Sequence, residues 1–125
     1  MTAVAAPPPT HPRPFADPAR RAAAIDAISQ FPLTATTDWK QLAKRLQPAG
    51  VEDIEAVPEG VFETDDHRFS AIATVYVRWE DRIGGRDVSS VESLPAQVSG
   101  HFEPSKEPPV AVVDTMSVDA SSVLE

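Results

Sequence analysis

The sequence contains no cysteine, so the chain can form neither a disulfide bond nor a thiolate metal site. It also lacks the motifs that mark common enzymes: a glycine-rich phosphate loop, GxSxG, HExxH and an EF-hand loop are all missing. No apolar run approaches the roughly 18 residues that a membrane helix needs, and the first residues carry no basic or apolar stretch typical of a signal peptide. These absences favour a cytoplasmic protein without a membrane segment or cofactor, and they weigh against an enzyme without settling the question.

Basic residues are scarce and unevenly distributed. The formal net charge is -8, with 11 lysine and arginine residues against 19 aspartate and glutamate residues. The bases outnumber the acids by three between residues 13 and 45, whereas the acids outnumber the bases by 11 from residue 52 onward. An acidic surface keeps a small domain soluble, and the asymmetry can also orient the molecule toward a charged partner.

Five of the 13 prolines fall within the first 16 residues. Proline removes backbone donors and favours the extended polyproline II conformation, so we expect residues 1–16 to form a disordered arm. The length of the chain suits a single domain with a modest core. We place this domain at residues 17–118, with residues 119–125 as a C-terminal tail.

Two short helices are predicted after the arm. Asp17 is a favourable N-cap, Pro18 suits the first helical position, and Pro32 stops the alanine-rich stretch that follows. Asp38 is expected to cap the second helix, with Gln41 three residues on as in a capping box, and Pro48 and Gly50 end it. Its residues divide into two opposite arcs, an apolar one with Trp39, Leu42, Ala43 and Leu46 and a polar one with Lys40, Gln41, Lys44 and Arg45.

Residues 69–98 carry the strongest pattern in the chain. Every second residue from Phe69 to Trp79 is apolar, the residues between them are polar except Ile72, and the pair Gly84-Gly85 follows. Glycine accepts positive φ at both positions of a two-residue hairpin turn, so we centre a β-hairpin there. This register places apolar residues opposite one another on one face, as Val75 with Leu94, Ala73 with Ala96 and Ala71 with Val98.

Weaker patterns complete the sheet. A first strand is expected within residues 53–64, interrupted by Pro58 and Gly60, and a last strand at residues 110–118. Pro95 has no N–H for a neighbouring strand, so we expect a bulge there or a pairing that avoids it. The predicted fold is α+β, with two short N-terminal helices packed on one face of a three- or four-stranded antiparallel meander.

Three sets of polar residues could carry chemistry. Asp65, Asp66 and His67 could bind a divalent cation, but aspartate is also a favoured turn residue, and a turn is the better-supported interpretation. Asp114 interrupts an apolar face, either as a functional carboxylate or as an inward-pointing charge that protects an edge strand. His101 has no nucleophile nearby in sequence. We therefore expect no catalytic residue.

The basic residues Lys40, Lys44 and Arg45 could contact a charged partner. Nucleic-acid binding normally shows a basic domain with interleaved aromatic residues, whereas this domain is acidic, so direct nucleic-acid binding is not expected. Trp79 and Val77 lie beyond the best-matched part of the hairpin, where they could form a partly exposed apolar patch.

These features favour a non-enzymatic protein-protein interaction module, such as an adaptor, accessory subunit or inhibitor of a larger protein, with a nucleic-acid-processing protein as one candidate partner. Its partner-binding residues would be Trp79, Val77, Lys40, Lys44 and Arg45. A free sheet edge would also allow a second copy to pair. The alternatives are a small metal-dependent hydrolase or nuclease using the Asp65-Asp66-His67 cluster, and phosphate binding through the basic helix face.

Overall fold

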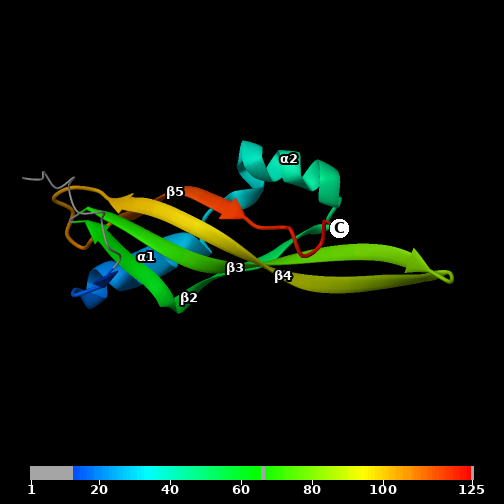
Figure 1. Cartoon of the computed structure of the whole chain (residues 1–125), viewed down its shortest axis with the longest axis horizontal. Helices are drawn as coiled ribbons and strands as arrows, with labels where there is room; N and C mark the ends of the chain where they lie inside the picture. Colours follow the sequence, from blue (N-terminus) through cyan, green and yellow to red (C-terminus); the bar gives the residue numbers. More distant parts are fainter. Residues whose placement is uncertain (1–12, 66, 125) are drawn as a thin grey trace, which may run out of the picture.

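The computed structural model describes residues 13–65 and 67–124, except for the side chain of Asp65. Its five strands form one antiparallel sheet in the order β1-β2-β3-β4-β5 (Figure 1). The elements in chain order are β1 (Arg13–Pro14), α1 (Pro18–Ser29), the 3-10 helix η1 (Leu33–Ala35), α2 (Thr37–Leu46), β2 (Gly50–Asp65), β3 (Arg68–Ile83), β4 (Arg86–Phe102) and β5 (Ala111–Val118). The α+β class with an antiparallel sheet is confirmed, but the sheet has five strands rather than three or four.

The β3–β4 hairpin has the register that the sequence predicts. Val75 lies opposite Leu94, Ala73 opposite Ala96 and Ala71 opposite Val98. Gly84 and Gly85 connect the strands with φ of 60° and 80°, a conformation that residues with a side chain rarely adopt. Because side chains alternate between faces, this register gathers the buried residues of both strands on one side.

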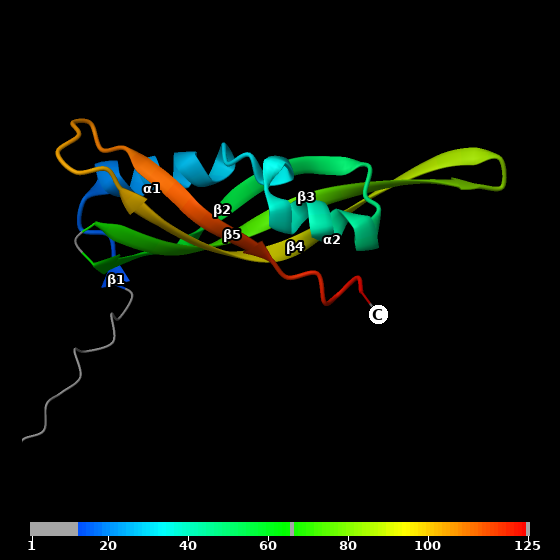
Figure 2. The ribbon, with the colours of Figure 1, turned by 90° about the horizontal axis from the view of Figure 1, so that it is seen from above.

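One face of the sheet carries the core. Its buried residues on β3 and β4 are Phe69, Ala71, Ala73, Val75, Val77, Leu94, Ala96, Val98 and Phe102. Ala24 and Ile28 of α1 belong to the same buried cluster, as does Trp39 of α2. α1 lies against both β2 and β5, which are on opposite sides of the central hairpin, so the sheet curls around this helix (Figure 2). Neither of the α-helices in the described part of the chain is long and apolar enough to cross a membrane.

The long strand β2 is irregular. Its pairing with β3 jumps from Ala56 to Val61, and the residues left out of register include Pro58 and Gly60. This is the interruption predicted from the sequence, because proline removes a ladder donor and glycine marks a bulge.

The helix boundaries follow local capping. The side chain of Asp17 accepts a hydrogen bond from Ala19 N–H at 2.9 Å, as expected for an N-cap. The predicted cap of α2 is wrong: Thr36 caps this helix and accepts from Trp39 N–H at 3.2 Å, while Asp38 lies in the first turn. The hydroxyl of Thr36 reaches the third residue beyond it, which is the usual geometry of a threonine cap.

The last residues of the predicted disordered arm belong to the sheet. Residues 1–12 lie outside the described residues, but Arg13 and Pro14 pair with β2. The buried carboxylate of Glu63 accepts from Ala16 N–H at 3.2 Å and lies 4.0 Å from the guanidinium of Arg13. The sequence did not predict this strand, because its segment is rich in proline. Its pairing with β2 also joins residues that are far apart in the chain, such as Arg13 and Glu63.

The predicted C-terminal tail also packs on the domain. The last residue of β4 that pairs with β5 is Ala96, which lies opposite Val118 and next to Pro95. The prediction that this pairing avoids Pro95 is therefore confirmed. The carbonyl of Pro95 still accepts from Asp119 N–H at 2.8 Å. Beyond it, Ala120 is buried in the core, which places this segment within the fold.

Aromatic rings close the end of the core near β1. The ring of Phe102 lies 5.9 Å from Phe15 and 5.4 Å from Phe69, centroid to centroid, and the guanidinium of Arg20 is 4.4 Å from its centre. Gly100 lies beneath this cluster, where a methyl group would collide with the Phe69 ring and with the carbonyl of Val112.

We therefore expect Gly100→Ala to lower the free energy of unfolding by about 1–3 kcal/mol, since an added methyl overpacks a closed site. Chemical denaturation followed by fluorescence measures this change. Gly50→Ala is the matched control, because open space surrounds its Cβ position and its stability should change by less than about 1 kcal/mol. Equal stabilities of the two variants would contradict the packing around Phe69.

The C-terminal turn should respond to acid. A hydrogen bond from Ser121 N–H, at 3.0 Å, lowers the pKa of the exposed Asp119 carboxyl. A lowered folded-state pKa stabilises the turn above the ordinary aspartate pKa of about 3.9, and this stabilisation is lost as the pH falls through the lowered value. An NMR titration should show the Ser121 amide shifting with an apparent pKa below the ordinary value. In Asp119→Asn this titration should disappear; its persistence would assign it to another group.

Candidate functional site

The Asp65-Asp66-His67 segment connects β2 to β3. Asp66 and the side chain of Asp65 lie outside the described residues, so the metal-site prediction for them stays a prediction. His67 is exposed, and its carbonyl accepts from the backbone N–H of Phe102 at 2.7 Å. The turn therefore lies beside the end of β4.

Next to this turn, three polar side chains meet on the face of the sheet opposite the core. Nδ1 of His101 lies 2.8 and 2.9 Å from the two carboxylate oxygens of Asp114, and the guanidinium of Arg68 lies 4.0 Å from the same carboxylate. A bulge places Asp114 here, because Thr115 pairs with Ser99 and Val113 with Gly100. The Asp114 side chain is 33% exposed, so the inward-pointing orientation considered from sequence parity is wrong.

This cluster gives little support to catalysis. Arg68 supplies the positive charge beside Asp114, and the cluster itself contains no serine, threonine or lysine that His101 could activate as a nucleophile. Among the side chains that the structure describes, which exclude Asp65 and Asp66, no group of three or more histidine, aspartate or glutamate residues could hold a metal ion. The contacts fit a surface network that fastens the bulge of β5.

Farther along the same face, Tyr76 lies opposite Asp53 on β2. A hydrogen bond with the side chain of Glu55, reinforced by its charge, raises the pKa of the Tyr76 hydroxyl. The phenol therefore stays protonated at neutral pH and is not poised as a base.

The predicted partner-binding residues separate into different environments. Lys40 and Lys44 are exposed on α2, while Arg45 lines a groove described below. Val77 is fully buried, at 0% exposure, so the expectation that it forms part of an exposed patch is wrong. Its side chain falls on the core face, because the hairpin continues to alternate up to that point.

Trp79 connects the hairpin to α2. Its side chain is half-buried, and its Nε1–H donates to the carbonyl of Leu46 at 2.9 Å. The last carbonyls of a helix have no partner within the helix, so this bond satisfies one of them. Trp79 thus holds the end of α2 against the sheet.

This role changes what substitution of Trp79 would measure. Trp79→Phe removes the indole donor and should lower the free energy of unfolding by about 0.5–1.5 kcal/mol. Trp79→Ala also removes packing and should cost about 1–3 kcal/mol, less than for a fully buried tryptophan. Urea denaturation measures both, and Ile83→Ala, which removes an exposed apolar side chain from the same strand, is the control. An unchanged unfolding midpoint for Trp79→Ala would show that α2 does not depend on this contact.

Beyond Trp79, the hairpin projects from the body of the molecule in both views (Figures 1 and 2). We call residues 79–93 the ribbon arm. β2 pairs with β3 only as far as Arg78, and β5 pairs with β4 only from Ala96 onward. Within the described chain, both outer edges of the ribbon arm are therefore free of other strands.

The ribbon arm exposes three apolar side chains that sequence reasoning missed. Ile83 is 62% exposed, Val88 40% and Val91 53%. Ile83 and Val88 lie on the same face as Trp79, with Val88 opposite Asp81, and Val91 lies on the other face, opposite Arg78. The predicted hairpin register was enough to place these three residues near the turn, beyond the part of the hairpin that the helices cover.

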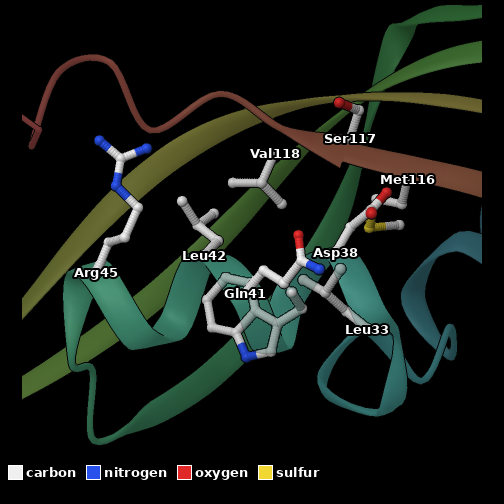
Figure 3. A pocket seen from close by; sticks show the side chains of 9 residues that line it. Leu33, Asp38, Gln41, Leu42, Arg45, Met116, Ser117 and Val118 are labelled. Atoms are coloured by element: carbon white, nitrogen blue, oxygen red, sulfur yellow. The ribbon is translucent and has the colours of Figure 1, made fainter.

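A groove of about 340 Å³ lies between α2 and β5 (Figure 3). Polar residues line it together with an apolar set. Arg45 lies at one end, while Asp38 lies at the other, beside Met116 and Ser117. The lining residues are Leu33, Asp38, Trp39, Gln41, Leu42, Arg45, Met116, Ser117 and Val118.

Comparisons of the chain with protein-family models, curated proteins and solved structures found no match.

Proposed function

We propose that this chain is a non-enzymatic protein-binding module, an adaptor, accessory subunit or inhibitor that contacts its partner through the ribbon arm. The observation that carries the proposal is the projection of this two-stranded segment, with Ile83, Val88 and Val91 exposed along it. Charged patches and helix faces are common on soluble domains, whereas an exposed hairpin with apolar side chains on both faces is not.

The ribbon arm has fewer stabilising contacts than the body of the sheet. A two-stranded hairpin is marginally stable in water, and its unpaired edges invite pairing with other chains. α2 reaches the base of the arm, where the carbonyl of Leu46 accepts from the indole of Trp79. Ile83, Val88 and Val91 nevertheless remain exposed in the described structure. A partner that covers the apolar side chains would bury them and would also order the arm, so both effects favour binding.

The arrangement of the side chains indicates how a partner would approach. Ile83 and Val88 are diagonal neighbours on one face, close enough to form a single apolar contact at the tip. Carboxylates outnumber guanidinium groups two to one on the ribbon arm, with Glu80, Asp81, Asp87 and Glu92 against Arg82 and Arg86. A partner surface with an apolar depression and a basic rim would match this combination.

The alternative functions have less support. A hydrolase would use the Asp65-Asp66-His67 cluster, and the carboxylate of Asp114, next to it, already contacts His101 and Arg68. Phosphate binding through α2 would depend on Lys40, Lys44 and Arg45, and Arg45 lines the same groove as the carboxylate of Asp38.

The test compares two exposed isoleucines on the same strand. Ile83→Ser should weaken the complex about tenfold or more, as expected for an apolar contact at an interface. Ile72→Ser is the matched control, because Ile72 is 48% exposed but lies within the body of the sheet. Neither exposed substitution should change the free energy of unfolding by more than about 0.5 kcal/mol.

The partner can be identified by placing a photo-crosslinking amino acid at position 83 and, separately, at position 72 in the native host. Crosslinking at position 83 followed by calorimetry with the purified partner would measure the effect of each serine variant. A partner that crosslinks at position 72 alone, or that binds Ile83→Ser with unchanged affinity, would contradict the proposal.

A further inference from the structure

We infer that the groove between α2 and β5 binds an extended peptide segment of a partner protein as an added strand, antiparallel to β5. This inference assigns a second binding site, on elements other than the ribbon arm, and it rests on the proposed function as a protein-binding module. The backbone of β5, the apolar wall of the groove and the charges at its two ends all match such a peptide.

The backbone of β5 offers unpaired groups at the groove. Asp119 N–H donates to the Pro95 carbonyl, and in an antiparallel ladder the groups that face a given neighbour belong to every second residue. Ser117 therefore points its N–H and C=O toward β4, whereas Met116 and Val118 point theirs outward. In the described part of the chain β5 is the last strand of the sheet, so no strand meets these groups.

The apolar wall lies where a bound strand would place its side chains. Met116 and Val118 face the core side of the sheet, where Trp39 and Leu42 of α2 line the same groove. A residue that pairs with Met116 or Val118 directs its own side chain to that side. A volume of about 340 Å³ is at the lower end of the range for ligand sites, which suits one large apolar side chain of a peptide.

The charged residues at the two ends of the groove indicate the direction of the peptide and the positions of its acidic and basic residues. Asp38 and Arg45 lie in the first and last turns of α2, about 10 Å apart along the helix axis. Residues four apart in a strand span about 13 Å, so an acid, an apolar residue and a base at alternate positions can reach Arg45, the wall and Asp38. β5 runs from the Asp38 end toward the Arg45 end (Figure 3). An antiparallel peptide therefore carries its acid on the N-terminal side.

The test uses the full chain and the labelled peptide acetyl-Ser-Glu-Thr-Leu-Thr-Lys-Ser-amide, with fluorescence anisotropy as the readout. The same peptide with Glu and Lys exchanged should bind about fivefold or more weakly, since both charges then meet like charges. Arg45→Glu should weaken the original peptide and strengthen the exchanged one. Preference for the exchanged peptide by the native chain would overturn the proposed direction.

Backbone methylation separates strand addition from simple hydrophobic binding. N-methylation of the central leucine removes the N–H that pairs with β5 and should weaken binding about tenfold or more. N-methylation of a flanking threonine, whose N–H points away from β5, is the matched control and should change affinity less than twofold. Equal effects of the two methyl groups would overturn the inference.

NMR locates the bound peptide and keeps this site distinct from the ribbon arm. The amides of Met116 and Val118 should shift and become protected from exchange, and Ile83→Ser should leave peptide affinity unchanged. Peptide shifts confined to residues 79–93 would overturn the inference while leaving the proposed function intact. Concentration-dependent protection of Met116 and Val118 without peptide would place a second copy in the groove and would also overturn it.

Discussion

The pairing of β3 with β4 determines which face of the sheet forms the core and where the helices pack. It holds Val75 opposite Leu94 and keeps the apolar side chains of both strands on one face, which α1 and α2 then contact. A slip of one residue would turn that face to solvent and leave the helices nothing to pack against. The Gly84-Gly85 turn enforces the register, because its two positive φ values fit a two-residue connection and disfavour residues with side chains.

The same pairing extends well beyond the region that the other elements can cover. β2 and β5 accompany the hairpin for part of its length, and α1 lies within the curl that they form. Beyond Arg78 of β3 and its partner Val91 of β4, the two central strands continue alone in the described structure. The long hairpin therefore supplies both the centre of the core and the ribbon arm, with Trp79 at the junction, where it also fixes the end of α2.

Local chemistry explains which parts of this structure the sequence could predict. The hairpin register and the first helix depend on neighbours in sequence, namely the glycine pair and the Asp17-Pro18 start, and both predictions are confirmed. Features that depend on distant residues escaped prediction. β1 is held by Glu63, and Asp114 is displaced by a bulge that the sequence does not mark. The groove was missed for the same reason, because α2 and β5 are far apart in the chain.

Pro95 has a consequence for the internal motion of the protein. Because it cannot donate to β5, β5 stops pairing beside it and the sheet narrows from four strands to three at that residue. It narrows to two strands farther along, beyond Arg78, where β2 ends. Regions with few long-range contacts and solvent-exposed hydrogen bonds open locally at a lower free energy than a packed core. The missing N–H on one side and the end of β2 on the other thus separate a slowly exchanging body from a projecting segment that can adjust its twist to the shape of another molecule.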